Sequence, residues 1–178
     1  MKLLKCIVVI FISFACNTSK AQLTVTGTDW VPSIDASSVT EAGIDYASDF
    51  SIESLVNQSE MDVTPILSAL LPPLFNWTVQ ASMTSVVNWH PNLELALRRS
   101  GDGTGSSLST GLGLGLTIIS PRINGGENYQ SLTVVPTTFF TGRARYQDIP
   151  IQYKISGLSV LIPTKTYSTD VLYTFIGL

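Results

Sequence analysis

The sequence predicts an all-β protein in which two antiparallel sheets pack as a β-sandwich of the immunoglobulin-like or pilin-like kind. Short runs of β-branched and aromatic residues recur along the chain, and Gly, Pro, Asn, Asp and Ser separate them. Residues 77–81 and 151–155 alternate apolar with polar side chains, so one face of each strand is expected to meet a core and the other water. About nine such strands in one domain are typical of a two-sheet sandwich.

The expected strands begin close to the N-terminus and leave little room for helices. Leu23, Val25 and Gly27 alternate with threonines in the first strand, which covers residues 23–30. The later expected strands cover residues 49–56, 75–83, 93–99, 112–119, 132–140, 149–156, 158–162 and 167–176.

One apolar segment, residues 65–71, suits either a short helix or a crossover between two sheets. Thr64 can cap the start of a helix, Pro65 fits its first turn, and Pro72 and Pro73 would end it. Propensity does not choose between the two structures, so both remain open.

The chain ends in a strand-like alternation instead of a polar tail. Tyr167, Thr169, Val171, Tyr173 and Phe175 are β-branched or aromatic, and polar side chains stand between most of them. This is the period-two pattern of a half-buried strand. Chain ends are usually poorly ordered unless they are tied down. Because this end has the pattern of a strand, we expect it to be paired in a sheet.

The first 21 residues are predicted to be a signal peptide. Lys2 and Lys5 precede an apolar run that is too short to span a bilayer, and Ser19 and Ala21 supply small residues before a cleavage site. Residues 22–178 would then form a single β-sandwich domain that is exported.

The expected location is therefore the periplasm, the cell surface or the medium. A lipoprotein signal with Cys16 as the lipidated residue is the alternative. No later run is long and apolar enough to predict a transmembrane segment.

Cleavage after Ala21 would leave a mature chain without cysteine or disulfide, because Cys6 and Cys16 are the two cysteines of the sequence. Removing three leader lysines from the ten basic residues leaves seven against thirteen acidic residues, a net charge of −6. Nucleic acid is not an expected partner, because phosphate binding depends on clustered Lys and Arg.

Catalytic chemistry is poorly represented in the sequence. Catalysis by a His-assisted nucleophile needs an imidazole beside it, and the one histidine, His90, precedes Pro91 in a predicted turn. Zinc sites normally require several His or Cys ligands. We therefore predict no catalytic residue, no metal site and no cofactor.

Acidic and glycine-rich segments do not alter that prediction. A glycosidase needs two carboxylates flanking a cleft, and the spacing of the acidic residues selects no pair. The acidic candidates are Glu53, Glu60, Asp62, Glu94 and Asp148. Residues 100–107 lack the Gly-Lys-Ser/Thr ending of a phosphate loop and are expected to form a hairpin loop, where Asp102 could join a calcium site.

Four residues are candidates for ligand binding. Trp77 and Trp89 could form a sugar platform if they are exposed, although Trp77 shares a predicted strand face with core residues. Arg143 and Arg145 are expected in a solvated loop, where they could contact a sugar or an anion.

The C-terminal part of the chain combines a turn with a closing strand of alternating Val, Thr and Tyr. Residues 162–167 would form the turn and residues 169–175 the strand, within the stretch TFFTGRARYQDIPIQYKISGLSVLIPTKTYSTDVLYTF. This layout resembles the end of small secreted bacterial β-sandwich proteins of the spore coat U and pilin-like families, and it is similar to envelope proteins of the Bacteroidota. The predicted mature chain departs from pilins because it lacks their frequent cysteine pair.

The resemblance implies a surface or periplasmic subunit that assembles through a chaperone and usher by strand exchange. A sheet with an open edge can accept an extended segment from a neighbour. The alternating segment 22–28 has the shape of a donor. The expected assembly residues are Leu23, Val25 and Gly27 in the first strand and Val171, Tyr173 and Phe175 in the last.

The sequence therefore favours a non-enzymatic structural or adhesive component of the bacterial cell envelope or of a surface appendage. Its expected partners are other envelope or appendage subunits, including copies of itself. A cell-surface carbohydrate-binding module is the alternative, with a glycan as partner, and a hydrolase that uses Asp and Glu ranks third.

Overall fold

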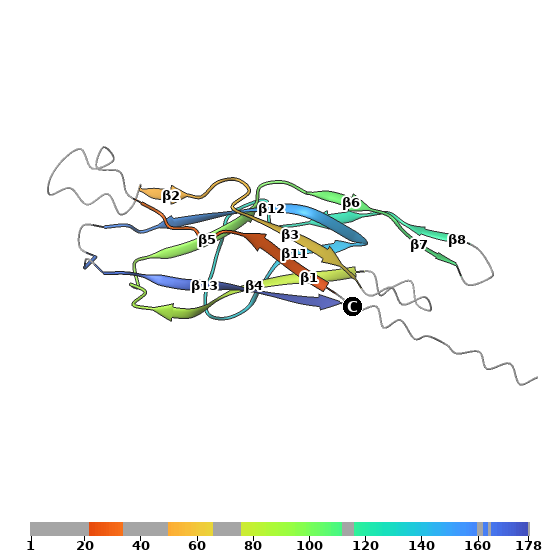
Figure 1. Ribbon diagram of the computed structural model, residues 1–178. Helices are drawn as coiled ribbons and strands as arrows, with labels where there is room; N and C mark the ends of the chain where they lie inside the picture. Colours follow the sequence, from red (N-terminus) through yellow and green to blue (C-terminus); the bar gives the residue numbers. More distant parts are fainter. Residues whose placement is uncertain are drawn as a thin grey trace, which may run out of the picture.

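The computed structural model describes residues 22–33, 50–65, 76–111, 116–159, 162–163 and 165–177. Within these ranges the chain forms thirteen β-strands and no helix (Figure 1). Two antiparallel sheets pack against each other, so the predicted all-β sandwich is confirmed. No described segment is a helix of the length and apolarity needed to cross a membrane.

The larger sheet is built around β12, which pairs with two strands on each of its sides. β3 and β2 pair with one side of β12, while β5 and β6 pair with the other. β1 and β10 form the two ends of the sheet. Its strands are β1 (Gln22–Gly27), β2 (Ser51–Glu53), β3 (Ser59–Thr64), β5 (Glu94–Arg99), β6 (Thr104–Ser106), β10 (Gln130–Ser131) and β12 (Arg145–Ser156).

The smaller sheet has four strands in the order β13, β4, β11, β9. Their bounds are β4 (Asn76–Val87), β9 (Arg122–Asn124), β11 (Thr137–Arg143) and β13 (Ser168–Gly177). β7 (Leu108–Gly111) and β8 (Leu116–Ile119) pair only with each other and project beyond the sandwich (Figure 1).

The core lies between the two sheets and is filled by alternate residues of their strands. In β4 the side chains of Trp77, Val79, Ala81 and Met83 are all buried, as the period-two pattern predicts. The facing side chains of the larger sheet are Met61, Val63, Leu95, Leu97, Ile149 and Ile151. The C-terminal strand joins this core through Val171, Tyr173 and Phe175, so the expected closing strand is confirmed.

Several strand bounds differ from the prediction. The described residues of 158–162 are not in a strand, and the strand expected over 132–140 starts at Thr137 because Pro136 lacks the N–H that a ladder needs. β3, β6, β7, β9 and β10 were not predicted, and β6 lies within residues 100–107, which were expected to form a hairpin loop. β3 places Glu60 and Asp62 on its outer face, which lowers the β-propensity of the segment. Of the segment expected as a short helix or a crossover, residues 66–71 lie outside the described residues. Residues 112–115, the first part of an expected strand, also lie outside them.

Candidate functional site

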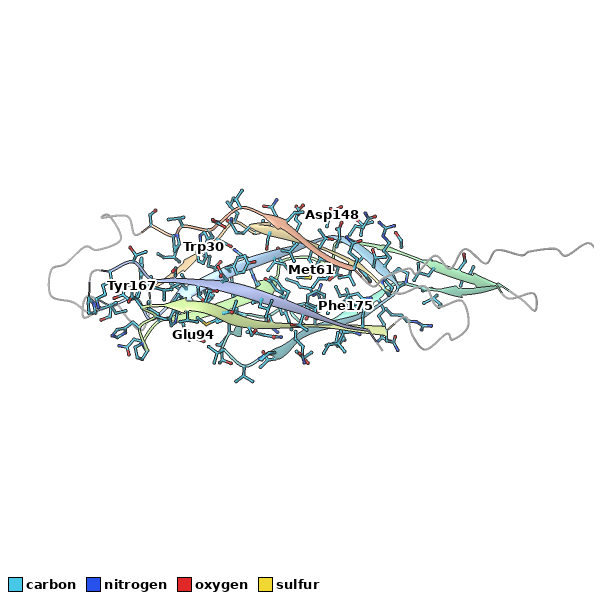
Figure 2. All side chains as sticks on the ribbon, turned by 60° about the horizontal axis from the view of Figure 1, so that its bottom comes forward. Trp30, Met61, Glu94, Asp148, Tyr167 and Phe175 are labelled. Atoms are coloured by element: carbon cyan, nitrogen blue, oxygen red, sulfur yellow. The ribbon has the colours of Figure 1, made fainter. Side chains whose placement is uncertain are left out.

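A groove runs along one side of the sandwich, between the edge strands of the two sheets. Within the described chain, β1 pairs only with β3 and β13 pairs only with β4, so each strand has one edge without a neighbour. The groove between them has a volume of about 1230 Å³. In Figure 2, Trp30 and Tyr167 lie toward one end of the sandwich and Phe175 lies toward the other.

The lining of the groove extends to the end of the sandwich that carries Trp30 and Tyr167 (Figure 2). Along β13 the groove is lined by residues only as far as Tyr173, and along β1 it starts at Leu23.

The walls of the groove are mainly apolar and reach the core. Leu93 and Leu95 are buried core residues that also line the groove. Aliphatic side chains from both sheets and from the segment after β12 add to the walls: Leu23, Val25, Ile52, Ile155, Leu158 and Val171. The charged residues of the lining are Asp29, Lys165 and Asp170. Side chains normally interdigitate to fill the space between the sheets of a sandwich, so the core is incomplete along this side.

Three hydroxyl groups cross the floor of the groove and connect the two sheets. Ser59 Oγ lies 2.7 Å from the Tyr153 OH, which lies 3.0 Å from the Tyr173 OH. Ser59 and Tyr153 belong to the larger sheet and Tyr173 to the smaller. Trp30 stacks on Tyr153, with ring centroids 6.2 Å apart.

Burial raises the pKa of Tyr173 well above its usual value, and the neighbouring Tyr153 hydroxyl adds to the increase. The phenol therefore stays protonated at neutral pH and keeps its hydrogen bond with Tyr153. This contact holds β13 against the larger sheet without introducing a charge into the apolar groove.

The two open edges carry few of the usual features that prevent pairing. Natural edge strands are commonly shortened, bulged, or marked with Lys or Pro. β1 has no charged residue and no Pro. β13 has no Pro, a single charge at Asp170, and one register irregularity between Ser168 and Asp170, so the rest of the strand is regular. These edges can therefore accept backbone hydrogen bonds from another strand.

The structure places five of the six expected assembly residues around the groove. Leu23, Val25 and Gly27 line it from β1, and Val171 and Tyr173 line it from β13. The sixth residue, Phe175 of β13, packs against the core. β1 pairs along its whole length with β3 of the same chain, so the expected donor strand is an edge strand of its own sheet.

Trp77 is not available as a sugar platform, and that interpretation of the residue is wrong. Its side chain is 1% exposed and its Nε1 donates a hydrogen bond to the Ala144 carbonyl at 2.7 Å. Phe140 and Tyr146 meet its ring edge-on, so the ring is part of the core.

Trp89 lies at the groove but does not join Trp77 in a platform. It is half-buried, lines the groove and packs against the core. Its Nε1 donates to the Leu93 carbonyl at 2.9 Å, so the ring orientation is held by its own turn.

Arg143 and Arg145 are exposed, and neither lines the groove. The loop expected for them is instead a strand-to-strand connection at Ala144, which is buried and has a φ of 66°. Arg143 ends β11 and Arg145 starts β12. Arg122 lies opposite Arg143 in the register of β9 and β11.

Sequence reasoning did not single out Trp30, Tyr153 or Tyr167 as site residues, although all three line the groove. The alternation around Tyr153 placed its side chain on the core face. No sequence signal joined Tyr153 to Trp30, because their stacking depends on segments that are distant in the chain.

Two of the acidic residues of the described chain have structural partners. No group of three or more His, Cys, Asp or Glu side chains that could hold a metal ion occurs among the described residues. The Asp62 carboxylate accepts the backbone N–H of Asp148 at 2.9 Å, and Asp102 pairs with Arg99 at 2.7 Å.

The predicted turn at His90 is confirmed. The His90 carbonyl accepts the Leu93 N–H at 2.9 Å and its Nδ1 accepts the Asn92 N–H at 3.2 Å. The imidazole therefore has a local structural role in the turn beside the groove.

The groove with its two open edges is thus the feature of the described chain best suited to bind another molecule. It has apolar walls, a neutral hydroxyl floor and unpaired strand edges on both sides. A comparison of the chain with protein-family models, curated proteins and solved structures finds no match.

Proposed function

We propose that the protein is an exported, non-enzymatic structural or adhesive component of the bacterial cell envelope or of a surface appendage. The observation that carries the proposal is the apolar groove bounded by the open edges of β1 and β13. The expected partners are other envelope or appendage subunits, and the function requires no cofactor.

An extended polypeptide fits this groove better than other ligands. Its backbone N–H and C=O groups would pair with an open edge, and its alternate side chains would enter the apolar gap. A lipid could fill the gap but would leave the strand edges unpaired. The proposed assembly mode is therefore the addition of a strand.

Fractionation of producing cells tests the proposal. Envelope and medium fractions are separated by size without boiling, and the protein is expected in high-mass species. Val25→Lys should reduce these species, because Val25 lines the groove and a lysine there would place a charge among apolar walls.

Val134→Lys is the matched control, because Val134 is an exposed valine that does not line the groove. This variant should assemble like the unchanged chain. Circular dichroism checks that both variants fold. A protein that is monomeric in every fraction, with or without Val25→Lys, would contradict the proposal.

Carbohydrate binding is the second candidate, supported by the aromatic side chains around the groove. Trp30, Trp89, Tyr153 and Tyr167 all line it, and aromatic faces are common platforms for sugar rings. Binding on a glycan array that is lost in Trp89→Ala, with the fold intact, would favour this function. Absence of binding to every glycan would remove it.

A further inference from the structure

The outer edge of β13 is the longest open strand edge in the described chain. β13 has ten residues, whereas the other end strands of the two packed sheets, β1, β9 and β10, have six, three and two, and β7 and β8 have four each. We infer that β13 pairs antiparallel with β13 of a second copy, so that the two smaller sheets become one continuous sheet. This pairing names a partner for one of the two edges on which the proposed function rests.

The side chains of β13 suit a copy of the same strand on both faces. Val171, Tyr173 and Phe175 point toward the core and groove, whereas Leu172 is 50% exposed on the outer face. A second β13 would place its own inward side chains over the open groove. It would also cover Leu172, an apolar residue that is otherwise in water.

Symmetry limits the possible registers. A two-fold axis perpendicular to the sheet pairs residues that point to the same face. If the axis passes beside Leu172, this residue lies opposite Leu172 of the second copy. Asp170 then lies opposite Thr174 of the second copy. Centring on Tyr173 would instead place Asp170 opposite Ile176.

Charge and polarity favour the register centred on Leu172. Asp170 is the one charged residue of β13. Opposite Thr174 its carboxylate meets a hydroxyl group, whereas opposite Ile176 it would meet an apolar side chain. No like charges face each other in the chosen register, although the mature chain is expected to be acidic overall.

A single engineered cysteine tests this register. The mature chain is expected to have no cysteine, because both cysteines lie in the predicted signal peptide. Directly opposite residues of an antiparallel pair have Cβ atoms about 4.5–5.5 Å apart. The exported Leu172→Cys protein should therefore form a disulfide-linked dimer under mild oxidation.

Thr174→Cys is the matched control on the same face of the same strand. In this register Thr174 lies four residues from its own copy, about 13 Å along the strand. This variant should remain mostly uncross-linked on a non-reducing gel. Equal cross-linking of both variants, or none in Leu172→Cys, would overturn the inference.

Light scattering on the exported protein provides a second readout. The unchanged chain and Val134→Lys should dimerise with rising concentration, and Leu172→Lys should stay monomeric because edge lysines block pairing. A monomeric unchanged chain at every concentration would overturn the inference. The proposed function would then still be decided by Val25→Lys, which acts on the groove and not on this edge.

Discussion

At the scale of the residue, Arg99 shows how the sandwich accommodates a charge in its interior. The residue is 2% exposed, and its guanidinium donates to the carbonyls of Gly101 and Gly125 and to the carboxylates of Asp102 and Glu127. A buried charge is tolerated only when such partners replace water. Arg99 therefore ties two loops to the end of β5.

Arg99→Ala should lower the free energy of unfolding by about 2–4 kcal/mol, because it leaves a cavity and removes several hydrogen bonds. Asp102→Asn should cost less than about 1 kcal/mol, since Asp102 is largely exposed and Glu127 stays paired. Urea unfolding of the two variants measures both effects. Similar losses in the two variants would contradict this account.

Tyr173 adds a residue-scale effect of pH on stability. Its pKa is raised by burial, so above pH about 10 the unfolded chain loses a proton that the folded chain keeps. The contribution of Tyr173 is complete below that pH, and stability falls as the pH rises above it.

Tyr173→Phe should weaken this alkaline loss of stability. The variant should also cost about 1 kcal/mol near neutral pH, because the hydrogen bond to Tyr153 is removed. Thermal unfolding over a series of alkaline pH values compares the two proteins. Burial also raises the pKa values of Tyr129 and Tyr146, so some alkaline sensitivity should remain.

At the scale of the element, β4 and β11 pack closely because a glycine faces a tryptophan. Gly142 lies directly opposite Trp77 in the register, and a Cβ on Gly142 would lie 2.2 Å from the Trp77 ring. The indole therefore occupies the space that a side chain on β11 would need. This pair therefore limits which side chains the end of β11 can carry beside the start of β4.

Gly142→Ala should destabilise the protein by about 1–3 kcal/mol or more, because the Trp77 ring must move within a filled core. Gly177→Ala is the control, since a Cβ there would make ordinary contact with Phe175 at 3.4 Å. Chemical unfolding measures both variants. Equal stability of Gly142→Ala and the unchanged chain would show that the ring has room to shift.

At the scale of the whole molecule, the sandwich depends on its core for stability if the predicted signal peptide is removed. The mature chain would then hold no cysteine, and so no disulfide could hold the sheets together. A domain of this length buries enough apolar surface to fold without one.

Mass spectrometry of the exported protein should therefore find Gln22 as its first residue. The melting temperature should be the same with and without a reducing agent. A mass that includes Cys16 with attached lipid would instead support the lipoprotein alternative. A change in melting temperature on reduction would show that a cysteine is retained.

The fold class followed from local patterns in the sequence. The alternation around Trp77 and Val79 identified a strand with one buried face, and the same period at Val171, Tyr173 and Phe175 identified the closing strand. These patterns are readable because successive side chains of a strand point to opposite faces. The short strand β3 was missed where acidic residues weakened the same signal.

The groove was decided only by tertiary structure. The alternation of a strand specifies its faces but not its edges, so it does not say which strand pairs on either side. β1 and β13 come from opposite ends of the described chain, and they border one groove because β3 and β4 carry them to the same side of the two sheets. The same long-range packing places Trp77 in the core and brings Tyr153 into contact with Trp30 and with Tyr173 of β13. The sequence by itself therefore determined a sandwich of strands, while the contacts between distant strands decided where it is open.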